Sequence, residues 1–215
     1  MVRMLAAAVL ALATTCGPAA PASVPGVTTG APTTARPAEA TAAAPSAAAT
    51  AAAAPSCAAP APLTIAQTEG PYFKAGAPQR TALADASSPG TRVVLTGHVL
   101  TRSCAPVAGA RLEFWQANAA GEYDNAGFAF RGHQLTDAQG RYRLETVVPG
   151  EYPGRTPHIH VKVIAGGREL VTQLYFPDKA QRNQADGIYR PGLTVTYAST
   201  GTPLDARFDF VIDAA

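Results

Sequence analysis

From residue 92 onward, the chain contains short runs of alternating polar and apolar residues, separated by turn signals, and this pattern constrains the fold most strongly. In one such run Tyr142 and Leu144 alternate with Arg141 and Arg143, so an extended strand there would have one apolar face. Turn residues such as Gly166-Gly167 separate the runs, and no stretch has helical periodicity over more than two turns. The runs expected to form strands are residues 92–100, 110–116, 141–148, 158–164, 169–176, 193–197 and 207–212.

Short strands at this spacing predict a mainly β fold, an antiparallel or mixed β-sandwich with long connecting loops. The two glycines at 166 and 167 predict a hairpin turn between the runs 158–164 and 169–176. Residues 63–215 amount to roughly 150 residues, which is the length of one domain with one core. We therefore expect a single sandwich domain over residues 63–215.

The first 62 residues have a different composition. Residues 1–13 carry one basic residue, Arg3, before an apolar run that has the length of a signal-peptide core and is too short to span a bilayer. We expect a signal peptide over residues 1–20 and export to the periplasm, the cell envelope or the medium. Cys16 follows an imperfect lipobox, so lipid attachment at Cys16 and ordinary cleavage both stay open. Residues 21–62 are nearly all Ala, Pro, Thr and Ser, which predicts a disordered tether.

Export makes the other cysteines interpretable. With Cys16 lipidated or removed, Cys57 and Cys104 remain as an even pair in an oxidising compartment, so we predict a disulfide between them, with two free thiols as the alternative. The 17 Lys and Arg residues nearly balance the 15 Asp and Glu residues and are scattered along the chain. This charge pattern predicts no surface for nucleic acid or for a membrane.

A His-x-His pair lies in the run 158–164. Successive side chains of a strand point to opposite faces, so His158 and His160 share one face while Ile159, Val161 and Val163 face a core. The two Cα atoms would be about 6–7 Å apart, close enough for the imidazoles to hold one metal ion. A His-x-His pair by itself is a weak signal. His98 and His133 lack such company, and we expect His98 to be a strand residue and His133 a pocket-rim residue.

The domain also has an interpretation without chemistry. Residues 95–99, 106–110, 136–142 and 148–152 resemble the transthyretin-like and carboxypeptidase-regulatory sandwich modules, which are binding or spacer domains. That interpretation predicts no catalysis and no metal.

Three further motifs favour an enzyme. They are Thr68-Glu69-Gly70-Pro71-Tyr72-Phe73, then Trp115 followed by Gly121-Glu122-Tyr123, and finally Tyr152 followed by Arg155-Thr156-Pro157-His158-Ile159-His160. In this order they resemble the intradiol ring-cleavage dioxygenases, the family of catechol 1,2- and protocatechuate 3,4-dioxygenases. The resemblance implies one non-haem Fe(III) per chain on a β-sandwich of the family's type. The implied iron ligands are Tyr123, Tyr152, His158 and His160.

The resemblance also implies a reaction and its partners, a small aromatic diol and O2, which give a cis,cis-muconate-type diacid. Tyr152 would leave the metal when substrate binds and act as a base, and Arg155 would stabilise negative charge on the ring. A surface salt bridge is the alternative for Arg155. The residues implied in substrate binding are Gly70, Pro71, Tyr72 and Gln173.

The chemistry of the ligand set points the same way. Fe(III) is a hard ion that favours anionic oxygen donors such as phenolates, whereas Zn(II) more typically recruits Cys or a third His. An Fe(II) site with two His and one carboxylate is a second alternative, with Glu151 or Asp124 as the carboxylate. Which catechol is cleaved and the oligomeric state stay open.

Overall fold

A computed structural model describes residues 54–214 of the chain. The signal peptide expected over residues 1–20, lipid attachment at Cys16 and most of the expected tether lie outside these described residues. Within residues 54–214, no helix is both long and apolar enough to cross a bilayer.

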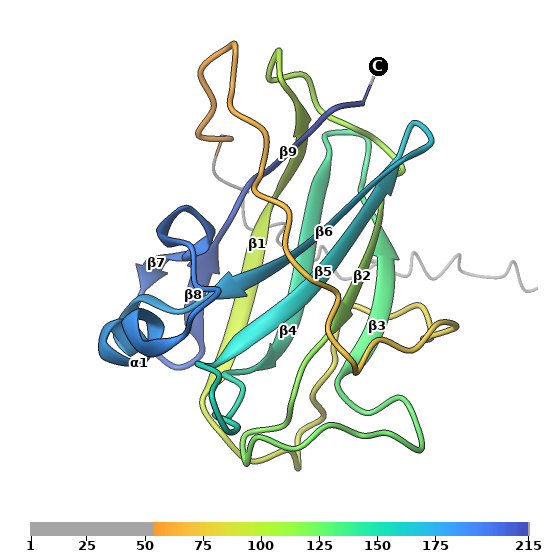
Figure 1. Cartoon of the computed structure of the whole chain (residues 1–215). Coiled ribbons are helices and arrows are strands. Elements are labelled where there is room, and N and C mark those ends of the chain that lie inside the picture. Colours follow the sequence, from red (N-terminus) through yellow and green to blue (C-terminus); the bar gives the residue numbers. More distant parts are fainter. Residues whose placement is uncertain (1–53, 215) are drawn as a thin grey trace, which may run out of the picture. The chain divides into compact units, whose positions relative to one another are not determined.

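The described residues form two β-sheets packed face to face (Figure 1). One sheet has the strand order β4-β1-β8-β7, with β9 also pairing with β1, and the other has the order β3-β2-β5-β6. Strands β8 and β9 run parallel to β1, and the other pairs are antiparallel, so the predicted mixed β-sandwich is confirmed. The strands are β1 (Arg92–Thr101), β2 (Arg111–Trp115), β3 (Arg131–Leu135), β4 (Arg141–Val147), β5 (His158–Ala165), β6 (Arg168–Tyr175), β7 (Thr196–Ser199), β8 (Leu204–Arg207) and β9 (Phe210–Ile212). The helical elements are η1 (Pro177–Lys179), α1 (Ala180–Ala185) and η2 (Pro191–Leu193).

The core lies between the two sheets and is built by the alternation seen in the sequence. Leu95 and Leu144 enter it from the five-stranded sheet, and Phe114 and Val161 enter it from the four-stranded sheet. The hairpin between β5 and β6 turns at Gly166 and Gly167, both with positive φ, as a two-residue turn of this kind requires.

Two strand predictions need correction, and one strand was not predicted. The sequence did not indicate β3, because Arg131–Leu135 has no apolar alternation, and this strand is placed by its pairing with β2. The run expected over 207–212 is divided between β8 and β9. The run expected over 193–197 begins later, because Leu193 ends η2 and β7 starts at Thr196.

The outer face of the four-stranded sheet is covered by an irregular stretch, residues 67–80, which we call the covering segment. In Figure 1 this orange to yellow segment crosses β6 and β5 toward β3. The N–H of Gln67 donates to Val171 O on β6, and the N–H of His133 on β3 donates to Pro78 O. Both faces of β5 are therefore buried over most of its length, although this sheet forms the outer layer of a sandwich.

The contacts of the domain begin before residue 63. Ala61 is buried, and its N–H donates to Arg102 O. Cys57 and Cys104 form the predicted disulfide, with their Cα atoms 5.8 Å apart. These residues of the expected tether are therefore attached to the sandwich.

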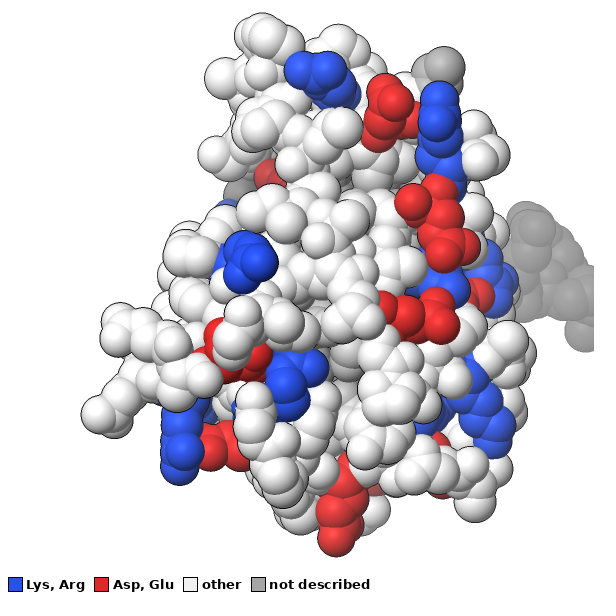
Figure 2. Space-filling view, viewed as in Figure 1, with Lys and Arg blue, Asp and Glu red and all other residues white. Residues whose placement is uncertain are grey.

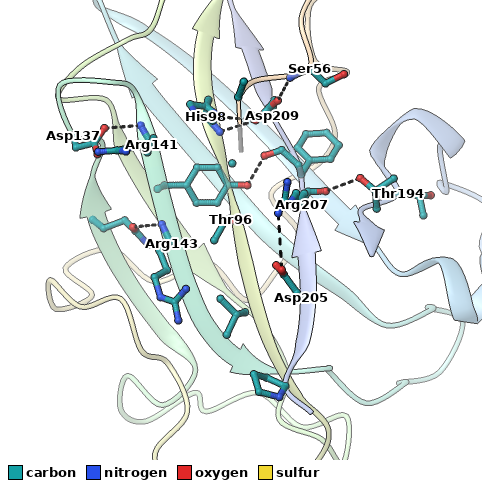
Figure 3. A pocket seen from close by; sticks show the side chains of 18 of the residues that line it. Ser56, Thr96, His98, Asp137, Arg141, Arg143, Thr194, Asp205, Arg207 and Asp209 are labelled. Atoms are coloured by element: carbon teal, nitrogen blue, oxygen red, sulfur yellow. Dashed lines mark hydrogen bonds and ion pairs between the residues drawn. The ribbon is translucent and has the colours of Figure 1, made fainter. Parts of the chain in front are cut away.

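Charged side chains on the surface are interleaved. On the face shown in Figure 2, Lys and Arg lie among Asp and Glu. Opposite charges also lie side by side in a groove on the outer face of the five-stranded sheet (Figure 3). There Arg141 pairs with Asp137, and Arg207 lies 4.0 Å from Asp205. His98 is the expected strand residue on β1, and its Nδ1 lies 3.1 Å from Asp209 Oδ1.

We predict that replacing Cys57 and Cys104 by Ser lowers the free energy of unfolding of the full-length protein. The disulfide joins residues separated by 47 positions, and a loop of that length is worth about 4 kcal/mol in the chain-entropy model. Denaturant unfolding of the oxidised protein and of the Cys57→Ser/Cys104→Ser variant measures the difference. Equal unfolding midpoints for the two proteins would contradict the prediction.

Candidate metal centre

Strand β5 presents His158 and His160 to the face under the covering segment. The strand register places His160 opposite Trp115 of β2 and Gln173 of β6, and it places His158 opposite Tyr175. The Trp115 indole stacks on the His160 imidazole with 4.8 Å between ring centroids. The two His Nε2 atoms are 3.1 Å apart, so the strand alternation predicted from the sequence converges both imidazoles on one point.

Both imidazoles are neutral near pH 7. Burial first, and the charge of Arg155 second, lower the pKa of His158 to about 4. Burial, followed by His158, lowers the pKa of His160 well below its usual value. His158 Nδ1 lies 2.7 Å from the carbonyl oxygen of Thr156; a carbonyl only accepts, so this nitrogen carries the proton and Nε2 keeps a lone pair. A metal ion is one partner that such a lone pair fits.

Tyr123 comes from the loop between β2 and β3. The loop packs closely at Gly121, where a Cβ atom would lie 2.0 Å from Glu151 O and where φ is +85°, so only glycine fits. This packing brings the Tyr123 ring centroid to 6.4 Å from that of His160. The Tyr123 hydroxyl is buried and has no hydrogen-bond partner among the described residues. Burial, with a contribution from Tyr152, raises the pKa of this phenol.

Tyr152 comes from the connection between β4 and β5. Its ring centroid lies 5.7 Å from that of His158 and 5.8 Å from that of Tyr123. Burial raises the pKa of Tyr152, and Arg155 opposes that shift. The structure thus brings together all four side chains predicted as ligands, two phenols and two imidazoles. Within residues 54–214, no group of three or more His, Cys, Asp and Glu residues is placed to hold a metal ion.

The covering segment closes the cluster from the other side. Tyr72 stacks on Tyr123 with 4.2 Å between ring centroids and meets Tyr152 edge to face at 6.1 Å. Gly70 lies over His160, where a Cβ atom would be 3.3 Å from His160 Cε1. Gly70, Pro71 and Tyr72 therefore lie in a segment that encloses the predicted ligands.

Arg155 joins the cluster to its surroundings. Its Nη1 donates to the Tyr152 hydroxyl over 3.2 Å, its Nη2 donates to Gln173 Oε1, and its Nε donates to Asp186 Oδ2 over 2.9 Å. The Arg155 side chain is 17% exposed and that of Asp186 is 1% exposed, which does not fit the alternative of a surface salt bridge. Gln173 Nε2 donates to Thr68 O, so Gln173 links Arg155 to the covering segment.

The two carboxylates of the Fe(II) alternative have other partners. Glu151 pairs with Arg182 over 3.0 Å. The Asp124 carboxylate accepts hydrogen bonds from the N–H groups of Ala126, Gly127 and Ala129 and so closes its own loop. Neither is shown in contact with the imidazoles, and the structure does not support a site with two His and one carboxylate.

Some residues of the site have no signal in the sequence. Arg131 on β3 is buried and donates to Tyr72 O and to Asp124 O, so it braces the two segments that carry Tyr72 and Tyr123. Asp186 contacts Arg155 from 31 positions away. These contacts join distant segments, and no local pattern indicates them. His133, expected at the pocket rim, has its Nδ1 2.7 Å from Ala77 O of the covering segment.

Comparison with known proteins identifies the family. A family model described as a dioxygenase matches residues 68–214. Among solved structures, the dioxygenase domain of a dioxygenase carbohydrate-binding protein fusion from Streptomyces sp. SirexAA-E is 50% identical; the match covers 72% of this chain and all of that domain, with a TM-score of 0.69.

Curated relatives include both chains of one enzyme. The protocatechuate 3,4-dioxygenase beta chain of Burkholderia cepacia is 42% identical over 107 residues, which are 41% of this chain and 46% of that protein. The alpha chain from the same organism is 35% identical over 169 residues, which are 68% of this chain and 84% of that protein. The match thus spans about half the length of the first relative and most of the second.

We predict that Gly70→Ala disturbs the cluster, with Gly76→Ala as the matched control. Both glycines have positive φ, but a Cβ atom at Gly76 meets nothing within 4 Å. Each substitution should therefore cost about 1–2 kcal/mol of backbone strain, while only Gly70→Ala pushes on His160 and lowers the amount of metal retained on purification. Thermal unfolding and metal analysis of both variants measure the two effects. Equal metal content in the two variants would show that a Cβ atom at position 70 does not disturb metal binding through His160.

Proposed function

The chain belongs to the intradiol ring-cleavage dioxygenase family, and from that premise we propose that it is an Fe(III)-dependent dioxygenase acting on a catechol-type substrate. The reaction opens the ring between the two hydroxyl-bearing carbons, and both atoms of O2 enter the diacid product. The observation that carries the proposal is the buried cluster of two phenols and two neutral imidazoles beside Arg155. A binding or spacer module without chemistry has no use for such a cluster.

The donor set fits one Fe(III) per chain. Tyr123, Tyr152, His158 and His160 would hold it, with the phenols bound as phenolates. The Tyr123 hydroxyl has no other partner among the described residues, and a hard cation supplies one. When bound, Fe(III) acts as a Lewis acid that favours ionisation of the catechol oxygens.

Tyr152 is the residue we assign to proton transfer. Tyr152 lines a cavity of about 300 Å³ together with Pro153, Gly154 and Arg155, and its Oη is the oxygen that would accept a proton from a substrate hydroxyl. Arg155 Nη1 donates to that oxygen, which favours the phenolate that accepts the proton. The same guanidinium then stabilises negative charge that develops on the ring.

The covering segment supplies the remaining walls. Gly70, Pro71 and Tyr72 lie over the ligands, and the Tyr72 ring packs on both tyrosines. Gln173 is fully buried, with partners at both ends of its amide. We assign it the role of orienting Arg155 and closing the floor of the substrate pocket. Excluding water in this way strengthens the electrostatic effect of Arg155.

We also propose that the protein is exported. The Cys57–Cys104 disulfide supports this, because disulfides persist in oxidising compartments. Cys16 lies outside the described residues, and a lipid attached to it would anchor the exported protein to the cell envelope.

Oxygen uptake with a panel of catechols tests the proposed function. Iron-loaded full-length protein should consume one O2 per substrate, and the product spectrum should be that of a muconate-type diacid. No uptake by iron-loaded protein with any catechol, or a product of extradiol cleavage, would overturn the proposal.

We predict that Arg155→Ala retains iron and loses most of its turnover. A cation that acts on charge in the transition state affects the rate more than it affects the metal ligands, and removing one such donor costs on the order of 10²–10³ in kcat. Steady-state kinetics and metal analysis measure both quantities. The control is Arg143→Ala, which removes an exposed ion pair with Glu145 and should leave turnover unchanged. Equal turnover in the two variants would show that Arg155 does not contribute to the reaction.

We predict different results for Tyr123→Phe and Tyr152→Phe. Both should lower activity, because the first removes a metal ligand and the second removes the proton acceptor. The spectrum of the catechol complex should stay closer to that of the wild type in Tyr152→Phe, because the family resemblance implies that Tyr152 leaves the metal when substrate binds. The control for loss of a hydroxyl is Tyr197→Phe, because the Tyr197 hydroxyl donates to Asp178 on the surface. Identical spectra for the two site variants would refute the division of roles.

A further inference from the structure

Asp186 is a buried carboxylate that the proposed reaction does not yet use. It follows α1 directly as its C-cap residue. Its Oδ2 accepts hydrogen bonds from Arg155 Nε over 2.9 Å and from the Thr156 N–H over 3.1 Å, and its Oδ1 accepts one from the Ile188 N–H over 3.1 Å. The side chain is 1% exposed.

The carboxylate is ionised in this environment. Burial alone would raise the pKa of Asp186, but the hydrogen bond from Arg155 and those from Ile188 and Thr156 outweigh burial and lower the pKa. A buried charge of this kind persists where it is paired and hydrogen-bonded. The pair is therefore an intact ion pair.

The geometry of Arg155 shows what the pair does. A guanidinium is planar, so fixing Nε sets the directions of both terminal nitrogens. With Nε on Asp186, Nη1 points to the Tyr152 hydroxyl and Nη2 points to Gln173. Asp186 is thus on the side of the guanidinium away from Tyr152.

Helix α1 also contacts Thr156, the residue that follows Arg155, through the side chain of Asn183. The Thr156 hydroxyl donates to Asn183 Oδ1 over 2.7 Å, and Asn183 Nδ2 donates to Phe176 O over 2.9 Å. The side chains of Asn183 and Asp186 therefore hold two consecutive residues, Arg155 and Thr156, by hydrogen bonds. The Thr156 carbonyl oxygen in turn accepts a hydrogen bond from His158 Nδ1.

We propose that Asp186 is a positioning residue of the reaction, which aims the Arg155 guanidinium at Tyr152 Oη and at the ring of the bound diol. The inference rests on the proposed function and adds a residue to it. Asp186 touches neither substrate nor metal in this account and acts only through Arg155. Its loss should matter only while Arg155 is present.

A double-mutant cycle tests this dependence. Asp186→Asn keeps the shape of the side chain and removes its charge, so it should lower kcat on the order of 10- to 100-fold, as expected for a displaced catalytic group, with KM little changed. In an Arg155→Ala background the same substitution should change kcat little. If Asp186 only stabilises the loop, Asp186→Asn lowers kcat equally in both backgrounds, and that result would overturn the proposal.

The matched control is Asp178→Asn. Asp178 belongs to the neighbouring η1, pairs with Lys179 at the surface, and has a side chain that is 46% exposed. Its substitution should leave kcat and KM unchanged relative to the parent protein in each background. If Asp186→Asn yields no soluble protein, Asp186→Glu replaces it in the cycle, because Glu keeps the charge and moves the carboxylate by one methylene; wild-type kcat in that variant would also count against the proposal.

A readout without turnover separates this inference from the proposed function. If the wild type cleaves no catechol, the proposed function fails, and the Arg155 Nε–H resonance of 15N-labelled full-length protein then tests the pairing alone. That resonance should be protected from exchange in the wild type and in Asp178→Asn, and it should lose protection in Asp186→Asn. Unchanged protection in Asp186→Asn would contradict the positioning role.

Discussion

The structure depends on a buried cluster of polar side chains, some of whose atoms have no hydrogen-bond partner among residues 54–214. Two neutral imidazoles bring their Nε2 atoms within 3.1 Å, and the hydroxyl of Tyr123 is buried beside them without a partner among the described residues. An unpaired polar group in the interior costs roughly 1–3 kcal/mol, so the cluster makes physical sense as the coordination shell of a cation. Phenolate oxygens favour a hard ion such as Fe(III) over Zn(II), which is why we propose Fe(III) for this cluster.

The covering segment follows from that constraint. An antiparallel sheet of a sandwich commonly leaves one face to solvent, yet here β5 is buried on both faces. The inner face carries the hydrophobic core through Ile159, Val161 and Val163. The outer face carries the polar cluster, and residues 67–80 keep it from water. A glycine at position 70 lets the backbone approach His160, and Arg131 ties the segment to the loop that carries Tyr123.

Local sequence patterns predicted the parts of this arrangement that depend on neighbours in the chain. The period of two in residues 158–164 placed both histidines on one face, and Gly166-Gly167 placed the hairpin, because both follow from backbone geometry. Tyr123 and Tyr152 carry no such pattern, and only the family resemblance singled them out. Arg131 and Asp186 were missed altogether. Arg131 lies in a strand without alternation, and Asp186 meets Arg155 through contacts between segments far apart in sequence.

Metal analysis combined with visible absorption of the full-length protein tests the central claim most directly. Protein produced with ample iron should contain about one Fe(III) per chain and should be red to burgundy, because phenolate ligands donate charge to a hard cation with open d orbitals. A colourless protein without iron after such growth would contradict the account. Full occupancy by zinc would contradict it equally, because the filled d shell of zinc accepts no such charge.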